Sequence, residues 1–176
     1  MKARAAQAAR IGFHWVTAAL VAIAFAAILY REGLDDPDQR LFWLDVHRSI
    51  GLTLLGLTVA RVIARVILPF NRVHETAPAM RVAAGLAHIA IYLGLVAMPL
   101  LGWAQSSAKA RKFKLFDIKM PSLVHHDSAL GETIGQWHEW IGWTILALIG
   151  LHALAALYHH YVRKDDVLRD MIRLRG

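Results

Sequence analysis

The sequence predicts an all-α membrane protein, a four-transmembrane-helix bundle formed by a single domain over residues 1–176. Hydrophobic residues make up 57% of the 176 residues and charged residues only 19%, whereas a soluble domain carries nearer a quarter charged residues. The mean hydropathy is +0.41. Four apolar stretches of about 20 residues recur along the chain, and a helix of that length crosses the hydrocarbon core of a bilayer. The alternating pattern of a membrane β-barrel does not occur.

The predicted helices follow these stretches in order. The first covers about residues 11–30, which contain no charged side chain, and the second covers about 45–68, with Arg61 and Arg65 inside it. The third covers about 82–103 and the fourth about 137–161. The connection between the first two is short and acidic, whereas a long outer loop over 104–136 joins the last two. A connection of that length is usually functional or disordered.

The distribution of positive charges predicts how the bundle is oriented in the membrane. Eleven Lys and Arg residues flank the helices on the side that holds both termini, and seven lie on the other side. Such residues gather on the cytoplasmic side of a membrane, so we expect a multi-pass protein with both termini in the cytoplasm. The net charge of +7 then belongs to the membrane flanks, and we expect no nucleic-acid partner.

The sequence contains no cysteine, which excludes several kinds of metal and cofactor site. Without thiolates the chain has no disulfide, cysteine zinc site, iron–sulfur cluster or covalently attached haem. The ten histidines are the best remaining ligands for a metal or cofactor. Histidine inside a membrane span is costly and points to function.

Four of these histidines fall into two pairs by depth. Fourteen positions separate His138 from His152 on the fourth helix, which puts both on one face and roughly 21 Å apart. His47 lies at the outer end of the second helix and His14 near the inner end of the first. We therefore expect His47 beside His138 on the outer side and His14 beside His152 on the inner side.

Two stacked bis-histidine sites suit two haem groups, each held at both axial positions of its iron. His88, at the inner end of the third helix, is an alternative to His14 as partner of His152. A single histidine in a membrane helix can instead hydrogen-bond a neighbouring backbone group. Four histidines at matching depths on three helices favour ligation.

Three arginines lie near these histidines. Arg48 follows His47, and Arg61 and Arg65 share one face near the inner end of the second helix. Each is a candidate to pair with haem propionates. The alternative is that their side chains extend to phosphate headgroups of the lipid.

Several stretches of the sequence resemble the bacterial cytochrome b561 family. They are LHALAALYHHY at 151–161, QWHE at 136–139, VHRSIG at 46–51 and GLAH at 85–88, and the resemblance extends from about Ile11 to Met171. It implies an inner-membrane protein with two non-covalent haem b groups. It assigns the inner haem to His14 and His152 and the outer haem to His47 and His138, and each haem brings one iron.

The resemblance also implies a reaction. A well-characterised relative is a superoxide oxidase, which takes electrons from superoxide at the periplasmic face and passes them through two haems to ubiquinone. We expect the same oxidoreductase activity here, with membrane lipid and the quinone pool as partners. The alternative is a quinone-reactive electron relay that anchors a dehydrogenase or a periplasmic redox partner.

Two further groups are candidates for substrate contacts. His159 lies seven positions after His152 and on the same helical face, so with His88 and Arg81 it is a candidate for the quinone site. A solvated helix end is the alternative. The outer loop is basic, which suits attraction of the superoxide anion, docking of a partner or contact with lipid headgroups. Its candidates are Lys109, Arg111, Lys112, Lys114 and Lys119, whereas His125 and His126 receive no assignment.

Overall fold

The computed structural model describes residues 2–67, 78–115 and 118–173. Its main elements are four long helices, α1 (Lys2–Glu32), α2 (Pro37–Ile67), α3 (Pro78–Ala108) and α4 (Ser128–Tyr158). A small antiparallel hairpin of β1 (Lys114–Leu115) and β2 (Ile118–Lys119) lies between α3 and α4. A π-helical turn, η1 (His159–Arg163), and a 3-10 turn, η2 (Arg169–Met171), follow α4.

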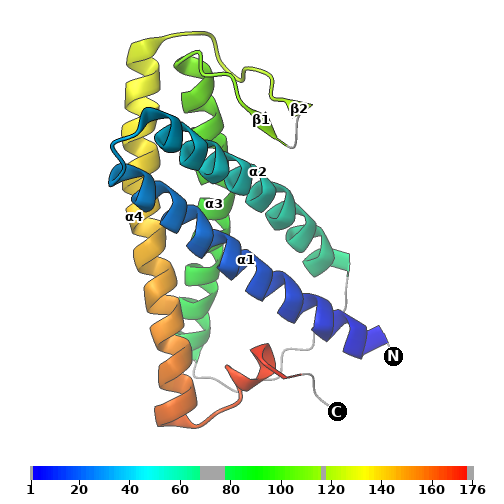
Figure 1. The fold of residues 1–176 in the computed structure, drawn as a ribbon. Helices are drawn as coiled ribbons and strands as arrows, with labels where there is room; N and C mark the ends of the chain where they lie inside the picture. The colour runs from blue at the N-terminus through cyan, green and yellow to red at the C-terminus, as the bar shows by residue number, and fades with distance from the viewer. Residues whose placement is uncertain (1, 68–77, 116–117, 174–176) are drawn as a thin grey trace.

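The helices form two helical hairpins. α1 packs along α2, α3 packs along α4, and α2 also packs on α3. Figure 1 shows the α1–α2 pair running obliquely across the α3–α4 pair. We call the end with β1, β2 and the α1–α2 turn the hairpin end, and the end with both termini the tail end.

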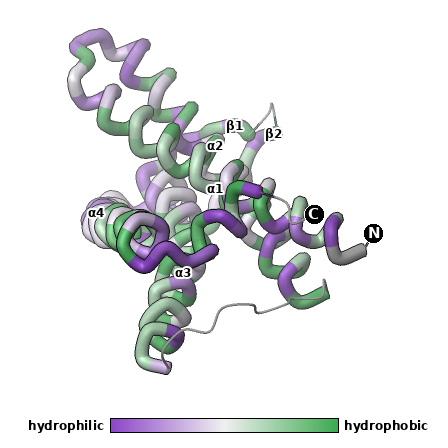
Figure 2. The backbone as a smooth tube through the Cα atoms, turned by 90° about the horizontal axis from the view of Figure 1, so that it is seen from below, coloured by the Kyte–Doolittle hydropathy of each residue, from purple (hydrophilic) through white to green (hydrophobic). Residues whose placement is uncertain are grey.

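Length and exposure of the helices fit a bilayer. Each of α1 to α4 has 31 residues, or about 46 Å at 1.5 Å per residue, which exceeds a hydrocarbon core of about 30 Å. All four contain a span apolar enough to cross a membrane. Large apolar side chains such as Leu93 (66% exposed) and Leu154 (63%) face outward, where lipid would cover them. Figure 2 shows hydrophilic residues gathered at the α1–α2 turn. The prediction of four transmembrane helices is therefore confirmed.

A small core joins the two hairpins at mid-depth. Val21 and Ala24 of α1, Leu54 of α2 and Leu95 of α3 form its buried cluster. The α3–α4 contact is closer still, because the isoleucine side chain at 145 occupies the place that a side chain at Gly94 would need. Glycine thus permits a backbone approach that any larger residue would prevent.

The helices extend beyond the predicted spans. The loop expected over 104–136 is wrong at both ends, because α3 continues to Ala108 and α4 begins at Ser128. The predicted span 45–68 begins inside α2, which starts at Pro37, and its last residue lies outside the described residues. Hydropathy marks the part of a helix that meets lipid, and polar turns continue into the headgroup region.

Hydrogen bonds hold the shorter loop against the end of α3. The indole of Trp103 donates to the carbonyl of Pro121 at 2.8 Å, and His126 Nδ1 donates to the carbonyl of Ala108 at 2.8 Å. Asp127 then caps α4 by accepting the backbone N–H of Leu130 at 3.0 Å. A side-chain cap of this kind satisfies one of the unpaired N–H groups at a helix start.

Candidate functional site

The hairpin-end pair consists of His47 on α2 and His138 on α4. Their ring centres lie 6.1 Å apart, with the planes 79° to each other. His47 Nδ1 lies 2.9 Å from the carbonyl oxygen of Ala24. Because a carbonyl only accepts, Nδ1 carries the proton and Nε2 is left as the ligating nitrogen. Gly102 of α3 lies against His138, where an added Cβ would meet Cε1 at 3.1 Å.

The tail-end cluster consists of three histidines, His14 on α1, His88 on α3 and His152 on α4. The ring centres of His14 and His152 lie 6.2 Å apart, and those of His88 and His152 lie 5.1 Å apart. His88 Nδ1 donates to the carbonyl of Ala84 at 2.6 Å. The structure therefore brings both candidate partners of His152 into contact with it.

These separations can be compared with the needs of a bis-histidine iron. Two imidazoles on opposite sides of one metal ion, each with a metal–nitrogen bond of about 2 Å, have ring centres about 6 Å apart. His47 and His138 at 6.1 Å and His14 and His152 at 6.2 Å fit that distance. His88 and His152, at 5.1 Å, are closer than it requires. The residues present thus fit a haem iron in both places.

Two of the three predicted propionate partners lie beside these histidines. Arg61 Nη2 lies 3.5 Å from His14 Nδ1, and its guanidinium covers the ring of Tyr92 at 5.3 Å. The side chain of Arg48 is only 9% exposed and pairs with Asp45 at 2.9 Å. Arg65 is exposed one turn beyond Arg61. The first two are therefore positioned to meet an anionic group near each histidine pair.

The basic residues of the outer loop separate into two groups. Arg111 and Lys112 line a cavity of about 250 Å³ together with Phe113, His125 and His126. Arg48 connects this cavity to the hairpin-end pair, because its guanidinium lies 5.4 Å from the centre of the Phe113 ring. Lys114 and Lys119 face each other across the β1–β2 ladder, and Lys109 packs beside Gly131.

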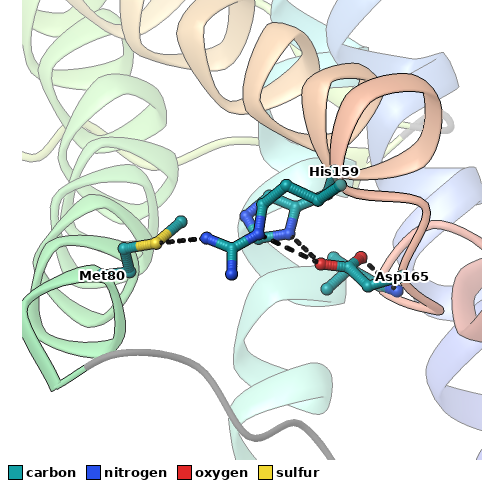
Figure 3. Close-up of polar contacts among 5 residues, drawn as sticks. Met80, His159 and Asp165 are labelled. Carbon is teal, nitrogen blue, oxygen red and sulfur yellow. Dashed lines mark hydrogen bonds and ion pairs between the residues drawn. The ribbon is translucent and has the colours of Figure 1, made fainter.

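At the tail end, His159 contacts Asp165 rather than another histidine that the structure describes. His159 Nδ1 lies 2.5 Å from Asp165 Oδ2, and Figure 3 shows the two side chains meeting beside the first turns of α3, which carry Met80. Arg81 is exposed in the first turn of α3.

Sequence reasoning missed three partners in these sites. Asp165 pairs with His159, Asp45 pairs with Arg48, and Phe113 lies beneath Arg48. Asp45 stands three positions before Arg48, a spacing that predicts an ion pair on a helix. The other two contacts depend on how loops fold back, and the sequence carries no comparable signal for them.

Comparison with known proteins identifies the family. A family profile described as prokaryotic cytochrome b561 matches residues 7–174. Cytochrome b561 homolog 2 of Escherichia coli is 32% identical over 91% of this chain and 87% of its own length. A probable superoxide oxidase, CybB, of Yersinia pestis is 33% identical over 95% of this chain and 96% of its own. Cytochrome b561 homolog 1 of Escherichia coli is 30% identical over 94% and 96%, respectively.

The profile covers nearly the whole chain, and each of these three relatives matches at least 91% of it. The four apolar helices agree with that match. This chain therefore belongs to the prokaryotic cytochrome b561 family, whose members are integral proteins of the inner membrane that bind b-type haem and transfer electrons across it.

Proposed function

We propose that the protein oxidises superoxide at the periplasmic face and reduces ubiquinone, with electrons crossing the membrane between two bis-histidine haem b sites. The observation that carries the proposal is the pair of imidazole separations near 6 Å at opposite ends of the bundle. When bound, haem iron supplies one-electron exchange. The hairpin end would face the periplasm, and both termini would lie in the cytoplasm.

Each histidine pair has a defined part in this proposal. His47 and His138 hold one haem at the hairpin end, and His14 and His152 hold the other at the tail end. The spacing of His88 from His152 supports His14 as the ligand and leaves His88 beside the site as a candidate contact for quinone. Arg48 and Arg61, next to the two pairs, would neutralise propionates, and so would Arg65.

The hairpin end suits an anionic substrate. Arg111 and Lys112 line a cavity that Arg48 connects to the hairpin-end pair through Phe113. Positive charge lining a concave surface raises the local concentration and the association rate of a small anion. Lys109, Lys114 and Lys119 would add to that field. The Yersinia pestis relative, a probable superoxide oxidase, supports the same substrate.

A stopped-flow experiment tests the proposal. Purified oxidised protein is mixed with a superoxide pulse, with and without a short-chain ubiquinone, while the visible b-type haem bands are followed. We expect rapid haem reduction and then quinone-dependent reoxidation. Haem bands that ignore superoxide but respond to quinol would overturn the superoxide assignment.

That second outcome would support an electron relay for a dehydrogenase or a periplasmic redox partner. The exposed charges of Lys112, Lys114 and Lys119 would then form a docking surface for an acidic protein. Stoichiometric co-purification of a redox protein, lost when these lysines are reversed in charge, would distinguish the relay from the oxidase.

A further inference from the structure

The chain folds back on itself directly after α4. The π-helical turn η1 ends at Arg163 and is capped by Lys164, whose φ of 55° is in the left-handed region that L-residues adopt rarely. The backbone N–H of Asp165 then donates to the carbonyl of His159 at 3.2 Å. This reversal returns the carboxylate of Asp165 to the imidazole of the residue that begins the turn.

The Asp165 carboxylate is held from several sides. Oδ2 lies 2.5 Å from His159 Nδ1, and Oδ1 accepts the backbone N–H of Val167 at 3.2 Å. Arg163 Nε lies 3.9 Å from Oδ2, and its Nη1 donates to the sulfur of Met80 on α3 at 2.8 Å. Figure 3 shows this chain of contacts linking the turn to α3.

Those contacts also set the charge of the carboxyl group. Partial desolvation works to raise the pKa of Asp165, but the hydrogen bonds from His159 and Val167 and the charge of Arg163 together hold that pKa below its ordinary value. Asp165 is therefore an anion at neutral pH. Because its oxygen only accepts, His159 Nδ1 must carry the proton, and Nε2 is the nitrogen that remains for a substrate.

The pair lies at the tail end of the bundle, partly open to water. The side chain of His159 is 13% exposed and that of Asp165 is 32% exposed. His152 lies seven residues back on the same face of α4, about 10 Å along the axis. Arg163 on η1 is a charged neighbour of the pair, and the ring centre of Tyr158 on α4 lies 6.3 Å from that of His159, while α3 presents Met80, which does not titrate.

We propose that Asp165 is a positioning residue that orients His159 and holds a proton on its Nδ1, so that Nε2 can take up protons from the cytoplasm and pass them to the quinone oxygen. This rests on the proposed quinone reduction. Two superoxide anions lose one electron each and become two O2, and quinone gains both electrons and two protons to become quinol. In each transfer a His159 N–H bond breaks, a quinone O–H bond forms, and water beside Asp165 returns the proton.

The test uses the full haem-loaded protein with Asp165→Asn, and Asp166→Asn as the matched control. Asp166 pairs with Arg169 on the surface at 3.3 Å and lies next in the chain. Haem is first reduced chemically, and its reoxidation by ubiquinone-1 is followed from pH 5.5 to 9. A carboxylate that orients a histidine is typically worth 10–100-fold, so we expect D165N to slow reoxidation about tenfold or more at pH 7.5.

The pH profile separates positioning from mere structure. We expect the dependence of the rate on pH to change in D165N, because an amide can donate as well as accept a hydrogen bond and no longer fixes the proton on His159 Nδ1. Asp165→Glu should restore most of the rate, and D166N should match the unaltered protein. An unchanged rate and profile in D165N would overturn the inference, as would a change in the KM for ubiquinone-1 alone.

Failure of the two proposals can be told apart. Chemical reduction of haem bypasses superoxide, so a protein that ignores superoxide but reduces ubiquinone-1 would overturn the superoxide assignment and still test Asp165. A protein whose reduced haem does not react with ubiquinone-1 would overturn both quinone reduction and the role of Asp165. Equal haem content in D165N and D166N shows that any difference between them does not come from loss of the fold.

Discussion

The two histidine groups differ in how the chain surrounds them. At the hairpin end, His47 is hydrogen-bonded to the Ala24 carbonyl, and the ring of His138 packs so close to Gly102 that it leaves little room for a side chain there. At the tail end, His152 meets two histidines, and Arg61 approaches His14 at 3.5 Å. Under the proposed function, the hairpin-end pair would take up electrons alone, whereas the tail-end cluster, which holds a third histidine, would be the place where electrons and protons meet.

Removing one proposed haem ligand from each group has the largest expected effect. Under the proposed function, we expect His138→Ala and His152→Ala each to lose one of the two proposed haems, because an iron held by one histidine binds weakly. The measurement is haem per protein by pyridine haemochrome absorbance. His126→Ala, outside both groups, should keep both haems.

The outcome would also show whether the two ends are independent. Roughly 21 Å of helix separates His138 from His152, so each variant should keep the other haem with an unaltered spectrum. Loss of both haems in either variant would contradict the picture of two separate sites.

The choice between His14 and His88 is the next largest test, since it concerns only the tail end. The separations of 6.2 Å and 5.1 Å from His152 favour His14 as the iron ligand. We expect His14→Ala to lose the tail-end haem, and His88→Ala to keep both haems and to slow reoxidation by ubiquinone-1. Haem content and stopped-flow rates measure the two effects. The reverse pattern would make His88 the ligand.

Charge reversal at the hairpin end should change rate without changing haem content. Lys112→Glu with Lys114→Glu weakens the positive field, so we expect superoxide-driven haem reduction to slow about tenfold at low ionic strength and to depend less on salt. Arg4→Glu with Arg169→Glu makes the same change in net charge at the tail end and serves as the control. Equal slowing in both double variants would show that only net charge matters.

Hydropathy predicts the number and order of the helices because lipid selects apolar side chains, but it does not predict where they end. Ser128 begins α4 nine residues before the apolar stretch at Trp137, because the cap at Asp127 and the packing of the loop on α3 decide that boundary. The rise per residue of a helix predicts which histidines lie at the same depth, but it does not choose between His14 and His88 as the partner of His152.

Contacts made by irregular segments have no such rule. The approach of Asp165 to His159 depends on a left-handed residue at Lys164, and lysine is not a residue whose presence signals that conformation. The cavity lined by His125 and His126 likewise depends on the paths of two loops, one between α3 and β1 and one between β2 and α4. The spacing of residues along a helix therefore predicts neither the His159–Asp165 contact nor this cavity.

The smallest expected effect tests the tightness of the hairpin-end pair. In Gly102→Ala the new methyl carbon would lie 3.1 Å from His138 Cε1, so the ring must shift by a few tenths of an ångström. Gly150→Ala, near His152, is the matched control, because nothing lies within 4 Å of its added carbon.

Each glycine substitution is made in a variant that is expected to keep only the haem beside it. G102A is combined with H152A, and G150A is combined with H138A. The measurement is the rate of haem transfer to excess apomyoglobin. This rate should be several-fold higher, up to about tenfold, in G102A/H152A than in H152A alone. In G150A/H138A the rate should equal that of H138A alone. If G102A and G150A changed the transfer rate of their parent variants equally, the hairpin-end pair would be no more tightly packed than the tail-end cluster. The difference in packing between the two histidine groups would then not stand.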